Sequence, residues 1–368
     1  MTMGFAAWAH TMNREPGEPV LMSLDYFGST AMAPEKVERF LHVVGATAEE
    51  LRTELEGRTG HYDFLPMQSK PILKTKDGLF VMDGGYLLDR FTKGLYWVVH
   101  DYLKFDLKDE DRRARWSEAH AEMVEKMVED KLRATAPGLF GSPERAFYGE
   151  ENFRKAYGGR ACDAGIDYGD RFVLFEIVDR QLSHGTRVEG KVESFKTDTE
   201  RAVVTKCRQL DATAQAVLKD PGRLTKSPPA PSMKVVPVLV IAGGYPSDPI
   251  SRSYAEELVE GMGLLKSEHI EKLAIITLPE VEMLEALAKT RQNHAGITTD
   301  WKASGLRNSS LRNYLTRRFG GEHEKLRPKR MEGQIEELFD ELETRLGFPR
   351  GTRRVPRVSG QSQSPASP

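Results

Sequence analysis

The sequence contains little cysteine: only Cys162 and Cys207 occur among its 368 residues. Two cysteines are too few for a disulfide framework or a cysteine-based zinc site, so we expect a protein of the reducing cytoplasm. No apolar run approaches the roughly 20 residues that a membrane helix needs, and the first residues do not form a basic segment followed by an apolar core. The sequence therefore predicts a cytoplasmic chain without a membrane partner.

The chain also lacks a strong net charge. Its 53 Lys and Arg residues nearly balance its 55 Asp and Glu residues, which leaves a formal net charge of -2 at pH 7. A nucleic acid, with DNA as the expected partner, would therefore have to meet a local basic patch. The segment 302–330 is such a patch, although a solvated helical face is the commoner explanation of basic runs. Its candidates for DNA contact are Arg307, Arg312, Arg317 and Arg318.

Three regions follow from the pattern of the chain. Residues 1–111 predict an α+β accessory region, with a hairpin at 72–82 and an apolar helical stripe over 85–103. Residues 112–348 predict the core together with C-terminal helices. Residues 349–368 consist mainly of Arg, Ser, Pro and Gly, a composition that predicts disorder.

The stretch from Cys162 to Val178 predicts a β-hairpin that carries two acids. Its middle, Tyr168-Gly169-Asp170, has the composition of a turn, and an apolar β-prone run follows it. Glu176 lies inside that run, where a carboxylate is costly unless a cation faces it. Asp163, on the preceding arm, is expected nearby, and two converging carboxylates suit Mg²⁺. Alternatively, Glu176 pairs with a buried Arg or Lys, or reaches water at a sheet edge.

Helices and strands are predicted on both sides of this hairpin. A helix over 115–133 carries Glu125 on the flank of its apolar stripe. Asp198 is expected to cap a second helix over 199–218, on which Lys206 and Gln209 share a face. Buried strands at 235–242 and 273–278 and a helix at 280–289 complete the pattern. The order helix, hairpin, helix, strand, strand, helix predicts an α/β fold with a mixed central sheet flanked by helices.

Over about residues 115–290 this pattern resembles the PD-(D/E)XK, or restriction-endonuclease-like, superfamily. Asp163 matches the first acid of the family and Glu176, in the phrase Leu-Phe-Glu-Ile, matches the second. Glu125 matches the acid that the preceding helix often supplies. Lys206 and Gln209 resemble residues of the following helix, where related families carry Lys or Gln beside the site. One position departs from the family, because Val178 stands where its lysine is expected.

The resemblance implies hydrolysis of DNA with Mg²⁺ or Mn²⁺ held by Asp163 and Glu176, and a role in defence against foreign DNA. The family's lysine offsets charge that develops at phosphorus, and Lys206 can replace it only if its side chain points to the site. Three hypotheses stay open: an active nuclease, a catalytically inactive nuclease-fold module that binds nucleic acid or a protein partner, and a structural protein in which Glu176 is merely ion-paired. The oligomeric state, including a homodimer, is left open.

Overall fold

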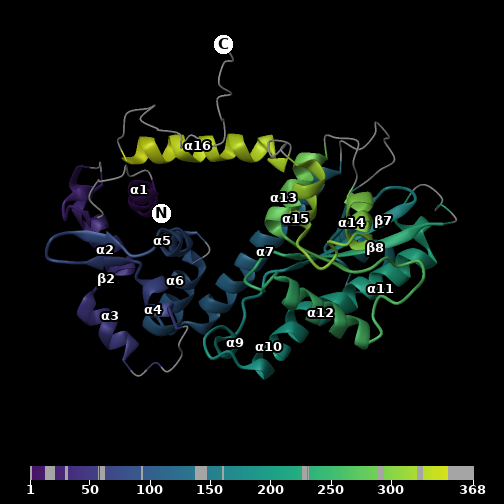
Figure 1. Ribbon diagram of the computed structural model, residues 1–368, viewed down its shortest axis with the longest axis horizontal. Coiled ribbons are helices and arrows are strands. Elements are labelled where there is room, and N and C mark those ends of the chain that lie inside the picture. Colours follow the sequence, from purple (N-terminus) through teal and green to yellow (C-terminus); the bar gives the residue numbers. More distant parts are fainter. Residues whose placement is uncertain are drawn as a thin grey trace, which may run out of the picture. The chain divides into compact units, whose positions relative to one another are not determined.

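The computed structural model divides into two compact units, one formed by Arg115–Glu332 and the other by Met1–Ala114 with Gly333–Pro368 (Figure 1). The predicted tail at 349–368 lies outside the described residues. Among the helices of the described residues, none is long and apolar enough to cross a membrane. The structure describes residues 2–12, 21–29, 32–56, 58, 63–92, 94–136, 147–159, 161–225, 230, 232–288, 294–320 and 326–346.

The Arg115–Glu332 unit is built around a five-stranded mixed sheet in the order β5-β6-β7-β8-β9. The first three strands are antiparallel neighbours, whereas β7, β8 and β9 run parallel. The predicted hairpin is confirmed as β6 and β7, with Ala164 opposite Phe175 and Asp167 opposite Phe172. The strand bounds are β5 Phe147–Gly149, β6 Ala164–Asp167, β7 Arg171–Val178, β8 Lys234–Ile241 and β9 Ala274–Thr277.

Helices cover both faces of this sheet, which confirms the predicted fold class (Figure 1). One face packs on α7 (Glu110–Thr135), α13 (Leu278–Leu287), α14 (His294–Ala303) and α15 (Leu311–Phe319). The other face packs on α8 (Glu150–Tyr157), α11 (Thr205–Lys219) and α12 (Pro249–Gly261). Side chains of β7 alternate between these two cores, as the period of two along a strand requires. Val173 enters the first core, and Leu174 and Val178 enter the second.

The hairpin needs a glycine at position 165 for steric reasons. A Cβ atom there would lie 2.6 Å from the Phe153 ring and 2.7 Å from the Phe172 ring. These two rings pack edge to face, with centroids 6.1 Å apart. Close packing of α8 on the hairpin is therefore possible only because residue 165 has no side chain.

The unit that contains the N-terminal residues has its own four-stranded sheet in the order β1-β4-β3-β2. The hairpin predicted at 72–82 is confirmed as the antiparallel pair β3 and β4. The single helix predicted over 85–103 is wrong, because α5 ends at Phe91 and α6 begins at Leu95. Thr92 leaves the helical conformation and Gly94, a poor helix former, follows it. The bounds are β1 Leu21–Met22, β2 Gly45–Thr47, β3 Ile72–Lys74, β4 Leu79–Val81, α1 Thr2–Met12, α2 Pro34–Val44, α3 Ala48–Leu55, α4 Leu65–Ser69, α5 Gly84–Phe91 and α6 Leu95–Asp101; η2 Tyr102–Asp106 follows α6, and α16 spans Lys329–Leu346.

The helix predicted over 199–218 begins earlier than expected. It starts with α10 (Val192–Thr199), continues through a π-helical turn, η3 (Glu200–Val204), and passes directly into α11. Asp198 therefore lies inside a helix, and the prediction that it caps the helix over 199–218 is wrong. Its carboxylate instead accepts hydrogen bonds from Ser183 and Thr186 at the start of α9 (His184–Arg187). The acid thus satisfies donors at the beginning of a different helix.

A buried carboxylate, Glu280, joins three segments on the first face. It accepts hydrogen bonds from the backbone N–H and the hydroxyl of Thr277, and its other oxygen accepts the backbone N–H of Arg312. Nη2 of the buried Arg252 lies 3.4 Å from Glu280 Oε2, and Nη1 of that arginine donates to the Ser309 carbonyl oxygen. A buried carboxylate with this many donors is stable, and it ties α12, α13 and α15 to one point.

His294 lies at the start of α14 and is 1 % exposed. Its backbone N–H donates to the Tyr168 hydroxyl. Its ring has no well-formed hydrogen bond among the described residues, and a contact with the Leu284 backbone opposes the effect of burial on its pKa. Burial lowers the pKa of His294 to about 4. An imidazole in such surroundings stays neutral at physiological pH, because the cation would be left without solvation.

We predict that His294 makes the protein sensitive to mild acid. The unfolded state takes up this proton near pH 6.5 and the folded state only near pH 4, so stability present above pH 6.5 is lost as the pH falls. The expected share of His294 is roughly 2 kcal/mol between pH 7 and pH 5. Urea denaturation of the wild type and His294→Leu at the two pH values measures it. His269→Leu, at an exposed histidine, is the control. Equal pH dependence in all three proteins would contradict the prediction.

Candidate functional site

Two backbone contacts fix Asp163 beside β7. The residue immediately precedes β6, and its N–H donates to the Phe175 carbonyl oxygen at 3.1 Å. Its carboxylate oxygen Oδ2 accepts the N–H of Ile177 at 2.6 Å. Asp163 is thus held at the position on β7 where Glu176 lies, and the expectation that the two acids are neighbours across the hairpin is met.

Glu176 and Asp163 both face Lys206, which α11 supplies. Lys206 Nζ lies 2.8 Å from Glu176 Oε2 and 3.5 Å from Asp163 Oδ2. The Glu176 side chain is 0 % exposed and the Lys206 side chain is 24 % exposed. Three residues that are 13 and 30 positions apart in sequence therefore meet at one place. Of the alternatives that the sequence left open for Glu176, pairing with a lysine is the one found, although Lys206 is half-buried and not buried.

Burial is the largest influence on the pKa of Glu176. It raises the pKa of Glu176 well above its ordinary value, the charge of Asp163 raises it further, and Lys206 opposes both. Burial alone would lower the pKa of Lys206, but Glu176 and Asp163 outweigh burial and raise it. Lys206 is therefore a cation at neutral pH, while one of the two carboxyl groups readily keeps a proton.

Lys206 reaches only one oxygen of the Glu176 carboxylate. Oε2 lies 2.8 Å from Lys206 Nζ, whereas Oε1 is buried and has no hydrogen-bond donor among the described residues. An unsatisfied buried carboxylate suits a cation in addition to Lys206. Mg²⁺ prefers oxygen ligands and is commonly held by one or two carboxylates with several waters. Asp163 and Glu176 fit that donor set, although within the described ranges no group of three or more His, Cys, Asp or Glu residues is arranged to hold a metal.

Glu125 projects from α7 and is exposed. Partial loss of solvation raises its pKa, the charge of Asp163 raises it further, and Lys206 lowers it. Glu125 thus shares the electrostatic environment of the two acids but forms no ion pair with a described residue. Gln209 lies one helical turn after Lys206 and is half-buried. Its amide makes no hydrogen bond to any residue that the structure describes.

Val178 shares the Glu176 face of β7 and is 2 % exposed within the second apolar core. The position where the family carries its lysine is therefore filled by an aliphatic side chain. Lys206 brings a cation to the same two carboxylates from the neighbouring helix. The π-helical turn η3 ends two residues before Lys206, and such turns rotate the positions that follow and often occur at functional sites.

Sequence reasoning missed a second acid–base pair nearby. Nδ1 of His120 on α7 lies 3.3 Å from Oδ2 of Asp179, which directly follows β7. The charge of Asp179 also raises the pKa of Glu125. Gly243 packs so closely on this segment that a Cβ atom would lie 2.8 Å from the Arg180 nitrogen. The signal available in the sequence was the position of Asp179, three residues beyond Glu176 at the end of the strand.

Both cysteines lie next to site residues but are unsuited to chemistry. Cys162 precedes Asp163, Cys207 follows Lys206, and both thiols are buried. Burial and the charge of Glu176 raise the pKa of each thiol. A buried thiol with a raised pKa is a poor nucleophile, so we assign these cysteines to packing.

The four arginines predicted to contact DNA are exposed, and they belong to a different part of the unit. Arg312, Arg317 and Arg318 lie on α15, and Arg307 precedes it. Arg318 is already engaged, because its Nη1 lies 2.8 Å from Asp300 Oδ2 and 2.7 Å from the Tyr314 hydroxyl. Within the described residues, none of the four forms an ion pair or hydrogen bond with the acids of the site.

We predict that Lys206 is required for stability only while Glu176 is charged. Lys206→Met should cost about 3 kcal/mol at neutral pH, because it leaves buried carboxylates without their cation. The double variant Lys206→Met/Glu176→Gln should recover most of that loss. Chemical denaturation at pH 7 of the wild type, the two single variants and the double variant gives the four free energies of unfolding that this double-mutant cycle compares. Lys219→Met, at an exposed position of the same helix, should change little. Simple additivity of the two single losses would argue against the coupling.

Comparisons of the chain with models of protein families, with curated proteins and with solved structures found no match. The functional assignment therefore depends on the residues and their geometry: two carboxylates on one hairpin, a helix lysine between them, and a mixed sheet that holds all three.

Proposed function

We propose that this protein is a restriction-endonuclease-like nuclease that hydrolyses phosphodiester bonds of DNA with Mg²⁺ or Mn²⁺, in a role such as defence against foreign DNA. The observation that carries the proposal is the convergence of Lys206 on Asp163 and Glu176. Of the three hypotheses drawn from the sequence, an active enzyme required a cation at this place from outside β7. Lys206 meets that requirement.

The acidic and basic residues of the site have different proposed roles. Asp163 and Glu176 supply the oxygen ligands for the divalent cation, which when bound polarises a phosphoryl oxygen and lowers the pKa of its water. Lys206, charged at neutral pH, can offset negative charge that develops at phosphorus. Glu125, with a raised pKa, is suited to hold or accept a proton next to the acids. Burial raises the pKa of Glu176, so a proton competes with the metal there and metal binding should strengthen as the pH rises.

A second function is favoured by a different reading of the same contact. Lys206 already contacts both acids, and in the described part of the chain no third acidic ligand joins them. A site in this state can keep its fold without binding metal. The alternative is therefore a catalytically inactive nuclease-fold module that binds nucleic acid or a protein partner.

Nuclease assays separate the two functions. The wild type should degrade DNA with Mg²⁺ or Mn²⁺, and Glu176→Gln should not, because the amide keeps the shape but not the charge. Lys206→Ala should lower the rate by about 10²-fold or more. Glu200→Gln and Lys219→Ala, which change exposed residues next to and on α11, are the matched controls and should stay active.

An inert wild type, over both metals and over single- and double-stranded DNA, would remove the enzyme proposal. Val178→Lys then becomes the informative variant, with Val178→Met as the control for side-chain length. Cutting gained only by the lysine would identify a preserved site that lacks its cation. Activity of Glu176→Gln equal to that of the wild type would place the chemistry elsewhere.

DNA binding through α15 makes a separate prediction. Arg312→Glu with Arg317→Glu should weaken binding to all sequences, and should reduce the slope of log affinity against log salt by about one for each phosphate that the protein no longer neutralises. Fluorescence anisotropy in chelator at several salt concentrations measures both effects. Arg318 is left unchanged because Asp300 already holds it. Lys219→Glu with Arg223→Glu, an equal change of charge at exposed positions, is the control. Unchanged affinity in the α15 variant would mean that α15 is an ordinary solvated helix and does not bind DNA.

A further inference from the structure

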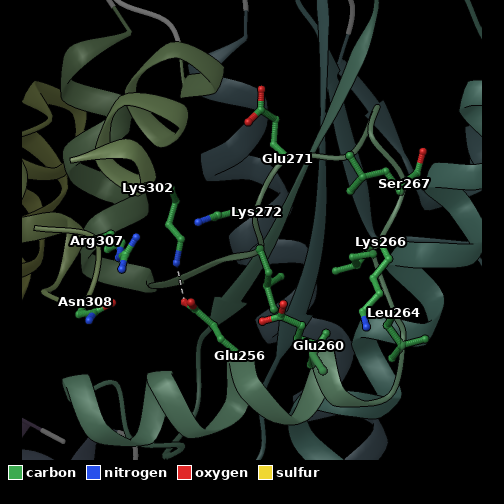
Figure 2. A pocket seen from close by; sticks show the side chains of 14 residues that line it. Glu256, Glu260, Leu264, Lys266, Ser267, Glu271, Lys272, Lys302, Arg307 and Asn308 are labelled. Carbon is green, nitrogen blue, oxygen red and sulfur yellow. Dashed lines mark hydrogen bonds and ion pairs between the residues drawn. The ribbon is translucent and has the colours of Figure 1, made fainter. Parts of the chain in front are cut away.

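A cavity of about 450 Å³ opens beside α12, between the segment 264–273 and the end of α14 (Figure 2). The segment leads into the amino end of β9, whereas Glu176 lies toward the carboxyl end of β7. Because β7, β8 and β9 are parallel, the cavity and the acidic site are at different ends of the strands. The cavity is thus separate from the proposed nuclease site, and what it binds does not depend on that proposal.

Three cations from different segments meet at one end of the cavity. Lys272 precedes β9, Lys302 belongs to α14, and Arg307 follows α14. Figure 2 shows the nitrogen-bearing ends of these three side chains gathered together. Lys302 is buried and its Nζ lies 2.6 Å from Glu256 Oε1. Lys272 and Arg307 are exposed and form no ion pair with any carboxylate of the described residues. Glu260 and Glu271 also line the cavity, but in Figure 2 the three cationic ends lie closer to one another than to Glu271.

The charge on Lys302 is held at a cost. Burial lowers its pKa, the charges of Arg252 and Lys272 lower it further, and Glu256 opposes them. A dianionic group placed among these cations would relieve the repulsion between them. Charge-assisted hydrogen bonds from Lys and Arg to phosphate oxygens are also among the stronger polar contacts in proteins.

The rest of the cavity is suited to a flat and partly apolar group. Val259, Leu264, Ile270 and Leu273 supply aliphatic surface, and Ser267 supplies a hydroxyl. In Figure 2, Leu264 and Ser267 lie on the side opposite the three cations. The volume falls within the range of roughly 300–1,000 Å³ that is usual for small-molecule sites, although polar and charged residues outnumber apolar ones in the lining.

We propose that this cavity binds a nucleoside monophosphate, with the phosphate against Lys272, Lys302 and Arg307 and the base against the aliphatic wall. The same chemistry is offered by a free nucleotide and by the phosphorylated end of a DNA strand. On this assignment Arg307 serves the cavity, separately from the arginines of α15.

Isothermal titration calorimetry on the full chain in chelator tests the proposal with deoxyadenosine monophosphate, deoxyadenosine and inorganic phosphate. The monophosphate should bind more tightly than either of the other two. Lys272→Glu with Arg307→Glu should weaken its binding by at least roughly tenfold, which corresponds to the removal of a single good polar interaction. Both positions are exposed, so the fold should survive, and a thermal melt checks this. Lys219→Glu with Arg223→Glu is the control of equal charge change.

The outcomes are distinct. Unchanged binding in the Lys272/Arg307 variant, or no binding of the monophosphate by the wild type at millimolar concentration, would overturn the assignment. Equal affinity for inorganic phosphate and the monophosphate would overturn the role of the aliphatic wall. Short DNA strands with and without a 5′-phosphate identify the source. A preference for the phosphorylated strand that the variant loses supports a strand end, and binding of the free nucleotide without that preference supports a free nucleotide.

Discussion

The contact of Lys206 with Glu176 and Asp163 is the constraint on which the Arg115–Glu332 unit depends. Each partner alone is unfavourable: Glu176 is a fully buried carboxylate, and burial lowers the pKa of Lys206 until the two acids raise it again. Together they hold α11 on the hairpin at a fixed rotation. A pair of this kind gives little net stability compared with apolar packing.

The surrounding strands and helix fix the positions of the three side chains. Asp163 is held by two backbone groups of β7, Glu176 is held by the sheet, and Lys206 is held by a long helix. Side chains positioned by regular elements and by their neighbours keep a defined geometry better than those on loops. Of these three side chains, Lys206 is the most accessible, so solvent reaches this group from the side of the helix lysine.

Much of this unit could be predicted from its sequence because its two central strands, β7 and β8, are apolar runs of eight residues. The hairpin and β8 follow from β-branched residues and from the turn at Gly169, and Pro279 with Glu280 marks the start of a helix. The predicted hairpin placed Asp163 near Glu176, and the resemblance to a known motif pointed to Lys206 only on the condition that its side chain turns toward them. Short or polar elements escaped this reasoning: β5 has three residues, and α15 is rich in arginine. The start of the helix at Val192 was missed because the segment before it is polar. The His120–Asp179 pair depends on contact between distant segments, and the periodicity of apolar residues along the sequence does not predict such contacts.

Glu280 has a consequence for how the unit opens. One carboxylate receives the amides of Thr277 and Arg312 and faces Arg252, so the ends of α12, α13 and α15 cannot loosen independently. Segments linked in this way unfold as one cooperative group. Their amide hydrogens should then exchange with solvent at a common rate set by a shared opening event, although 35 residues separate the two amides along the chain.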